Sequence, residues 1–254
     1  AVNTTRPIIA DFSNGNDGGV LKDTDELTDI EGQRVNLVEL SVSHYLLARA
    51  LESVGMSERD VTVVNTSDAD IVGTFSTPDV TAAVTWNPQL SELRAMPEAN
   101  VVFDSSDIPG EIIDTLALNT EVLEANPELG KALTGAWYEI MARMSGDDET
   151  GVDARTRMAE AAGTDLAGYE AQLASTQMFY DAADAVEFVT SDQPEATMDN
   201  VRQFAYDRGL LGATATSPDF VGIEFTDGSV LGSEDNVKLR FTSEYMEMAA
   251  EDAL

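Results

Sequence analysis

Polar side chains gather where a predicted strand gives way to a predicted helix. The stretch VNLVELSVSHYLLARALESVGM, residues 35–56, holds Glu39, Ser41, Ser43 and the only histidine of the chain, His44. If the strand ends before Ser41, then Ser41 or Ser43 caps the helix, and unbonded backbone N–H groups lie at the strand's carboxyl end. Open α/β sheets bind ligands at that end. The junction therefore predicts a polar ligand site, while a serine that only caps its own helix is the simpler interpretation.

The stretch VTAAVTWNPQLSEL repeats this arrangement. A predicted strand delivers Trp86 and Asn87 to its carboxyl end, and Pro88 begins the next helix at a position that suits proline. The indole of Trp86 offers a flat wall for a ligand, with about 0.5–2 kcal/mol of attraction for a cation. Packing within the domain is the alternative role for this ring.

Two further segments add polar candidates. In VVNTSDADI, Ser67 and Asp68 follow a strand, where either residue also suits a helix cap. In VVFDSSDIPGEIIDTLALN, Glu111 and Asp114 lie in or beside a polar loop between two strands. Most residues of such loops face water, and ligand contact is the alternative for these two.

The remaining motifs argue against catalysis and metal binding. The chain has no cysteine, and a single histidine cannot build a multi-histidine metal site or, without a placed partner, a catalytic triad. The polar loop DFSNGNDGG departs from the spacing of a calcium loop. The sequence also contains no P-loop, G-x-G-x-x-G, G-x-S-x-G or H-E-x-x-H motif. We therefore predict that the protein is not an enzyme and uses no cofactor and no metal.

The elements that would position these residues fall into two halves. Short β-branched runs alternate with helical patterns from about residue 25 to 115, which is typical of a parallel α/β sheet. After Asn119 the pattern predicts amphipathic helices near 127–145, 152–162, 165–174, 178–188 and 194–208. A hairpin around Asp227-Gly228 and a last helix near 242–250 follow.

The charge of the chain is strongly negative. Its 47 acidic and 14 basic residues give a formal net charge of −33 at pH 7. Such a charge repels nucleic acid and anionic membranes, because binding to either needs lysine and arginine. The acidic residues are scattered rather than gathered in a tail, which favours an acidic surface adapted to a halophilic or marine setting. We predict no nucleic-acid partner.

Targeting signals are absent from the printed sequence. No stretch approaches the roughly 20 apolar residues of a membrane-spanning helix, and AVNTTRPIIADF lacks the basic start and apolar run of a signal peptide. The lack of cysteine excludes disulfides without identifying the compartment.

A family resemblance rests on the long segment GQRVNLVELSVSHYLLARALESVGMSERDVTVVNTSDADIVGTFSTPDVTAAVTWNPQLSEL. Its strand-Ser-x-x-x-Tyr-helix start, its D-I-V-x-x-F helix and its W-N-P strand end resemble the nitrate, sulfonate and taurine type of periplasmic solute-binding protein of ABC importers. The motifs SSDIPGEIID, NPELGKALTGAWYE and DNVRQFAYDRGLLG extend the likeness over nearly the whole chain, and they are most similar to the urea-carboxylase-associated branch.

The resemblance implies a type II periplasmic-binding-protein-like α/β fold, with two lobes joined by two crossing strands and ligand held in the cleft. The crossings are expected near DGGVLK and IIDTLALN. Residues 23–113 would then form the second lobe, and 1–22 with 114–254 a helix-rich first lobe. Ligand contacts are expected from this set: Glu39, Ser41, Ser43, His44, Ser67, Asp68, Trp86, Asn87, Glu111 and Asp114.

The start of the chain departs from the family pattern. Family members open with a segment that supplies core strands of the first lobe, and AVNTTRPIIADFSNG resembles only the end of that segment. We therefore expect an incomplete first lobe, either a fragment or a truncated form. A homodimer through this lobe is a further expectation, because helices would otherwise expose apolar faces.

The resemblance implies a periplasmic solute-binding component that passes a small nitrogen-containing solute, urea- or guanidine-like, to an ABC permease. A sulfonate, taurine or nitrate ligand is the first alternative, and a remnant that self-associates without binding is the second. The pyrimidine-precursor synthases that share the fold rely on cysteines and histidines, and the absence of cysteine argues against that enzyme class.

Overall fold

The computed structural model describes residues 2–254 and divides into two compact units. Unit 2 comprises Ser13–Ile112, and unit 1 comprises the chain up to Phe12 together with Ile113–Leu254. The chain thus passes between the units twice. The outward passage lies between Phe12 and Ser13, ten residues before the boundary expected at residue 23, and the return passage lies between Ile112 and Ile113.

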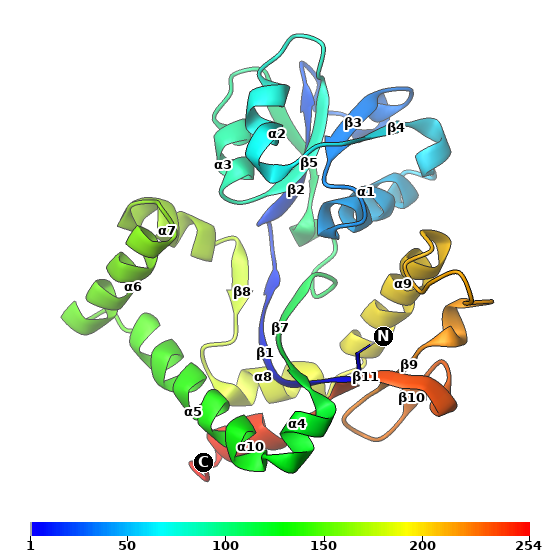
Figure 1. Cartoon of the computed structure of the whole chain (residues 1–254). Helices are drawn as coiled ribbons and strands as arrows, with labels where there is room; N and C mark the ends of the chain where they lie inside the picture. The colour runs from blue at the N-terminus through cyan, green and yellow to red at the C-terminus, as the bar shows by residue number, and fades with distance from the viewer. Residues whose placement is uncertain (1) are drawn as a thin grey trace. The chain divides into compact units, whose positions relative to one another are not determined.

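Unit 2 is a five-stranded sheet in the order β4-β3-β5-β2-β6, covered by three helices (Figure 1). Strands β3, β4 and β5 are parallel, while β2 is antiparallel to both β5 and β6. The strands are β2 (Asp17–Lys22), β3 (Arg34–Leu37), β4 (Thr62–Asn65), β5 (Ala82–Trp86) and β6 (Ala99–Asp104), and the helices are α1 (Val42–Ser53), α2 (Asp68–Phe75) and α3 (Gln89–Arg94).

The segment Asp17–Lys22 explains the shifted crossing. It was expected in the first lobe, but as β2 it pairs with β5 and β6 inside the unit 2 sheet. Its two glycines leave room for close neighbours, and Val20 and Leu21 are each 1% exposed. Burial of these two apolar side chains stabilises the position of the strand inside the unit 2 sheet. The polar residues around the segment did not indicate this burial.

Apolar residues divide between the two faces of the unit 2 sheet because successive strand residues point to opposite sides. On one face, Val20 and Ala83 pack against α2 and α3, which contribute Phe75, Leu90 and Leu93. Helix α1 contacts β2 and β5. Its buried residues Leu46, Leu47 and Leu51 recur at helical spacing.

Unit 1 contains a second sheet, in the order β10-β9-β11-β1-β7, with β8 also paired to β1. Strand β1 runs parallel to β11 and antiparallel to β7. The strands are β1 (Thr4–Ser13), β7 (Ile113–Asn119), β8 (Thr176–Met178), β9 (Gly222–Glu224), β10 (Val230–Leu231) and β11 (Val237–Phe241). The helices are α4 (Thr120–Ala125), α5 (Pro127–Met144), α6 (Glu149–Ala161), α7 (Leu166–Leu173), α8 (Ala182–Val189), α9 (Gln193–Asp207) and α10 (Glu244–Ala250).

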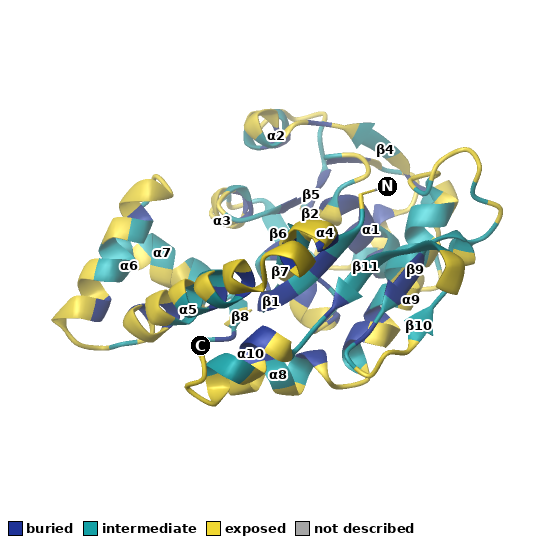
Figure 2. Cartoon of the chain, turned by 60° about the horizontal axis from the view of Figure 1, so that its bottom comes forward, coloured by how far each residue is buried: buried dark blue, intermediate teal, exposed yellow. Residues whose placement is uncertain are grey.

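The core of unit 1 joins the middle of this sheet to α8 and α10. Ile9 and Met246 are fully buried there, and Figure 2 shows the buried colour concentrated along β1. Phe12, Phe179 and Phe188 form an aromatic cluster with ring centroids 5.2–6.0 Å apart. Helices α6 and α7 contact one another and carry few buried residues.

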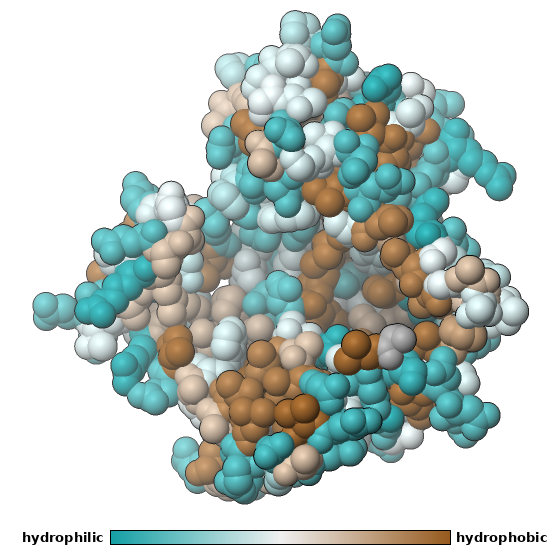
Figure 3. Space-filling model, in the orientation of Figure 1, coloured by the Kyte–Doolittle hydropathy of each residue, from teal (hydrophilic) through white to brown (hydrophobic). Residues whose placement is uncertain are grey.

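Polar residues dominate the visible surface of each unit, and brown apolar atoms gather near α4, α5 and α10 of unit 1 (Figure 3). Val122 on α4 and Leu129 on α5 are 47% and 36% exposed. In the described part of the chain, no helix combines the length and the apolar character needed to cross a membrane.

Candidate ligand-binding site

The carboxyl ends of four strands meet at one edge of the unit 2 sheet. Strands β3, β4 and β5 are parallel, and β6 shares their direction because β2 is antiparallel to both β5 and β6. Glu39, Ser41, Ser67, Asp68 and Asn87 of the sequence-predicted ligand set follow these strands, and Trp86 is the last residue of β5. The topology therefore brings together residues that are up to 48 positions apart in the sequence.

The start of α1 is held mainly by Ser41. Its hydroxyl accepts a hydrogen bond from the Ser43 backbone N–H at 3.1 Å and donates to the Val38 carbonyl at 2.7 Å. Ser43 is fully buried, so its hydroxyl does not reach the surface. Glu39 is exposed, and its backbone N–H donates to Asn65 Oδ1 at 2.9 Å. At this junction the Glu39 carboxylate is the group most accessible to a solute.

His44 stabilises the sharp turn that precedes the helix. Leu40 has a left-handed backbone, with φ of 63°, and its N–H donates to His44 Nδ1 at 3.0 Å. The other ring nitrogen, Nε2, lies 3.0 Å from Glu58 Oε2. Because Nδ1 accepts a hydrogen bond, the tautomer with its proton on Nε2 fits both contacts. His44 is 2% exposed, and this network gives it a structural role at the junction.

Replacing His44 with alanine is expected to destabilise unit 2 by about 1–2 kcal/mol, because the Leu40 N–H and the Glu58 carboxylate each lose a partner. Thermal unfolding followed by Trp86 fluorescence in a Trp137→Phe background would report on unit 2. The control is Glu58→Gln, which keeps a hydrogen-bond acceptor and should cost less. Unchanged melting of His44→Ala would contradict the structural role.

The start of α2 is rich in acids. Ser67 donates its hydroxyl hydrogen bond to Asp70 Oδ2 at 2.6 Å rather than capping the helix. Burial raises the pKa of Asp68 above its ordinary value, and its Oδ1 has no hydrogen-bond partner within residues 2–254. Ser67 also lines a surface groove of about 940 Å³ that lies between α2 and the strands β3 and β4. Two acids in the first turn of α2 make this helix start a poor place for an anion.

Trp86 and Asn87 lie at the end of β5. Trp86 is partly buried, and in the pairing of β5 with β2 it lies opposite Asp17. The Asn87 backbone N–H donates to the Asn16 carbonyl at 2.9 Å, and its Oδ1 accepts from the Ser91 hydroxyl at 2.6 Å. These bonds hold the backbone next to Trp86 in place, so the end of β5 that carries the indole is fixed.

A buried hydrogen-bond network supports the same edge and was not predicted. Ser105, fully buried, lies 2.6 Å from the Ser13 hydroxyl and accepts from the Gly15 N–H at 2.7 Å. Ser13 also donates to Asp17 Oδ2 at 2.6 Å. The polar loop before β2 is thereby tied to the end of β6. The two segments are about 90 residues apart in the sequence, and only the pairing of β2 with β6 brings them together.

Glu111 is engaged inside unit 2. Its carboxylate accepts from the Tyr45 hydroxyl at 2.5 Å and from Arg49 Nε and Nη2 at 2.7 and 2.9 Å. This paired contact links α1 to the segment that carries Glu111, just before the chain returns to unit 1. Glu111 therefore has a structural role within unit 2, and its expected contact with a ligand stays a prediction.

Asp114 belongs to unit 1, where it pairs with Asp11 across β1 and β7. Asp11 is 9% exposed. Burial in the first place, and the negative charge of Asp114 in the second, raise the pKa of Asp11 to about 7. The two carboxyl groups hydrogen-bond to one another, which is possible when one of them keeps its proton.

Across residues 2–254, no three His, Asp or Glu side chains are grouped so that they could hold a metal ion.

Comparisons with known proteins show similarity in sequence and in fold. The family model described as NMT1/THI5 like matches residues 19–143. The taurine-binding periplasmic protein of Escherichia coli (strain K12) is 26% identical over 107 residues, which cover 41% of this chain and 33% of that protein. The chain therefore matches only about a third of the length of this curated relative.

Solved structures share the fold. The periplasmic aliphatic sulphonate binding protein SsuA from Escherichia coli aligns with a TM-score of 0.67 and 17% identity, over 83% of this chain and 70% of that one. The desulfurization enzyme DSZB aligns with a TM-score of 0.55 and 15% identity, over 82% and 73%. The fold thus occurs in both binding proteins and an enzyme. By sequence, residues 19–143 match the family model described as NMT1/THI5 like, and by structure the chain has the α/β fold of the periplasmic solute-binding proteins.

Proposed function

We propose that this protein is the solute-binding component of an ABC importer and captures a small urea- or guanidine-like solute. The proposal places it in the periplasm, with a membrane permease as its partner and no bond chemistry of its own. Support comes from the names of its relatives, which are a taurine-binding and a sulphonate-binding periplasmic protein. A homodimer remains a separate prediction.

The observation that carries the ligand proposal is the composition of the unit 2 sheet edge. Glu39 offers an exposed carboxylate, Trp86 offers an aromatic ring, and Asn87 follows directly on the same strand end. A planar cation such as guanidinium has N–H donors that suit a carboxylate and a face that stacks on an indole. Urea has the same shape and donors without the charge.

A sulfonate or taurine ligand is the second candidate, and the relatives' names favour it. An anion would need donors at the helix starts. The Ser41 hydroxyl is engaged at the start of α1, and Asp68 and Asp70 lie in the first turn of α2. We therefore place the planar nitrogen-rich solute first.

Binding can be tested with a panel of solutes at matched ionic strength. Guanidinium chloride and urea, at millimolar concentrations far below denaturing ones, are expected to give saturable heat in calorimetry and to raise the melting temperature. Tetramethylammonium chloride is the control for charge without N–H donors. Proton NMR of the recovered solutes should show no turnover.

Two outcomes would overturn parts of this proposal separately. If taurine or ethanesulfonate binds tightly while guanidinium and urea give no heat, the ligand class is wrong and the binding function stands. If a bound solute is converted to product, the transport role itself is wrong.

A further inference from the structure

Strand β7 forms an open edge of the unit 1 sheet. It is seven residues long, and among the described strands it pairs with β1 alone. None of its residues is buried, and Ala117, near the middle of the apolar run, is exposed. An edge strand of this length offers a row of unpaired backbone groups to a strand of another chain.

The unpaired backbone groups belong to the odd-numbered residues of β7. Just beyond the two ends of the strand, the Thr120 N–H donates to the Asn3 carbonyl at 3.1 Å, and the Ile112 carbonyl accepts from the Ser13 N–H at 2.9 Å. Even-numbered residues thus bond to β1, and in an antiparallel pair successive residues direct their backbone groups to opposite sides. Both register shifts add their extra residue to β1, so the alternation along β7 is unbroken. The residues whose N–H and C=O groups point away from β1 are Ile113, Thr115, Ala117 and Asn119.

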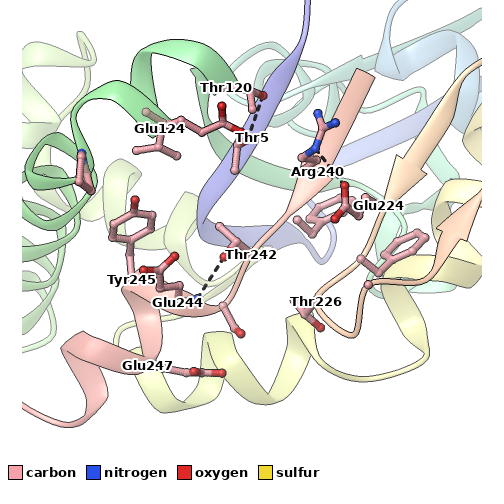
Figure 4. Close-up of a pocket in the computed structure, with 16 residues that line it drawn as sticks. Thr5, Thr120, Glu124, Glu224, Thr226, Arg240, Thr242, Glu244, Tyr245 and Glu247 are labelled. Carbon is pink, nitrogen blue, oxygen red and sulfur yellow. Dashed lines mark hydrogen bonds and ion pairs between the residues drawn. The ribbon is translucent and has the colours of Figure 1, made fainter. Parts of the chain in front are cut away.

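Side-chain contacts hold β7 in place at both ends. The Thr120 hydroxyl, directly after the strand, lies 3.0 Å from the Thr5 hydroxyl of β1, and both residues are buried. Figure 4 shows this contact beside the cavity that β1, α4 and β11 line. At the other end, the Asp114 carboxyl group is hydrogen-bonded to that of Asp11. The free edge of β7 is therefore a fixed strand.

The other strand edges of the described chain are short or irregular. Strands β10, β8 and β4 have two, three and four residues. In β6, Val102 is an extra residue between the partners of Gly19 and Val20. Such a bulge bends the strand and turns its edge away from a straight partner. Strand β7 has no extra residue, no proline and no lysine, so it lacks the features that usually prevent edge pairing.

The sequence of β7 suits pairing with a second copy of itself. Antiparallel pairing about Leu116 places the outward backbone groups of Thr115 opposite those of Ala117 in the second copy. All seven residues overlap in this register, and Leu116 lies opposite Leu116. Asp114 is the one charged residue of the strand, and it then lies opposite Leu118 rather than a like charge.

The charge of the protein makes such an association dependent on salt. Two copies that each carry a formal charge of −33 repel one another at long range. The Debye length falls from about 10 Å at 0.1 M salt to about 3 Å at 1 M, which screens this repulsion. Backbone hydrogen bonds and leucine contacts act at short range and are kept. With one charged residue, β7 also presents no charge pattern that would select a different partner.

We propose that two copies of this protein associate through β7, which pairs antiparallel with β7 of the second copy about a two-fold axis at Leu116. The two unit 1 sheets then form one continuous sheet. The sequence predicted a homodimer through apolar helix faces, whereas the proposed surface is a strand edge. The association does not depend on the solute proposed for unit 2.

Analytical ultracentrifugation in about 0.1 M and about 1 M NaCl tests the association. The dissociation constant of the dimer is expected to be at least about tenfold lower at the higher salt concentration. Ala117→Pro removes an outward N–H and should weaken the dimer about tenfold or more. The matched control is Ala117→Thr, which keeps this N–H and suits a strand, and it should associate as the unchanged protein does. Equal melting temperatures would show that both variants fold.

Single cysteines report on the register, because the chain has no cysteine of its own. Leu116→Cys places two thiols opposite one another at a pair without hydrogen bonds, where the Cα atoms are about 4.5 Å apart and a disulfide can form. Mild oxidation at high salt is expected to give a covalent dimer. The matched control is Leu118→Cys, which makes the same change on the same strand face. Its thiol lies opposite Asp114 of the second copy, so it should stay monomeric on a denaturing gel.

Four results would each overturn the proposal. The first is a monomer at high salt and high protein concentration, including one that retains an extended peptide of another protein on this edge. The second is equal cross-linking of the two cysteine variants, which would indicate random collision. The third is equal association of folded Ala117→Pro and Ala117→Thr, which would place the interface elsewhere. The fourth is growth beyond the dimer, because a two-fold contact closes.

Discussion

Replacing Trp86 with alanine is expected to weaken guanidinium binding by about tenfold or more. The indole provides the flat face at the end of β5, and a cation over an aromatic ring gains up to about 2 kcal/mol when water is excluded. Truncation also removes the apolar contact area of the ring. Calorimetry on the two proteins measures the ratio of dissociation constants directly, and Trp86→Phe should recover part of the loss.

The same experiment with Glu39→Gln separates charge from stacking. A charge-assisted hydrogen bond contributes roughly 1.5–3 kcal/mol, so loss of this acid should weaken guanidinium about tenfold and weaken neutral urea less. Glu31→Gln is the matched control, because Glu31 is equally exposed but precedes β3 and lies at its amino end. Stronger binding by Glu39→Gln would show that the solute is an anion.

The second large effect concerns Asp11 and pH. The pKa of Asp11 is about 7 in the folded protein against an ordinary 3.8. Between these values the folded state keeps a proton that the unfolded chain releases, so the free energy of unfolding falls as pH rises toward 7. Asparagine carries no charge at any pH. The stability gained by Asp11→Asn should therefore be about 2 kcal/mol larger at pH 8 than at pH 5.

Thermal unfolding at the two pH values, followed by Trp137 fluorescence in a Trp86→Phe background, measures this difference in unit 1. In Asp114→Asn the pH dependence should shrink without vanishing, because burial is the larger cause of the raised pKa. An equal gain from Asp11→Asn at pH 5 and pH 8 would show that Asp11 is ionised in the folded protein at both.

Local sequence patterns were sufficient to predict most of the secondary structure. The helix expected at 127–145 is Pro127–Met144, and the one expected at 194–208 is Gln193–Asp207. Both show apolar residues at helical spacing, and both have proline in the first turn. The hairpin at Asp227-Gly228 was likewise correct, since β9 pairs with β10. These features depend on residues close together in the sequence.

Features that depend on distant residues were predicted less well. The short strand Thr176–Met178 lies just before α8, where a helix was expected from residue 178. The partner of Asp114 could not be read from the sequence, because Asp11 lies 103 positions away and becomes a neighbour only through the β1–β7 register. For the same reason the partners of Glu111, which are Tyr45 and Arg49, could not be predicted from the sequence.

The way in which unit 2 interrupts unit 1 has a consequence for synthesis of the chain. Unit 2 is continuous in sequence. In unit 1, by contrast, β1 can complete its strand pairing only after β7 and β11 have been synthesised, as the pairs Thr4–Asn119 and Thr4–Leu239 show. Contacts between such distant residues slow folding, and domains that are continuous can form while the rest is still being made. During synthesis, the edge of β1 that pairs with β11 therefore stays open after β7 has emerged, and for that interval it is an unpaired strand edge that could pair with another chain.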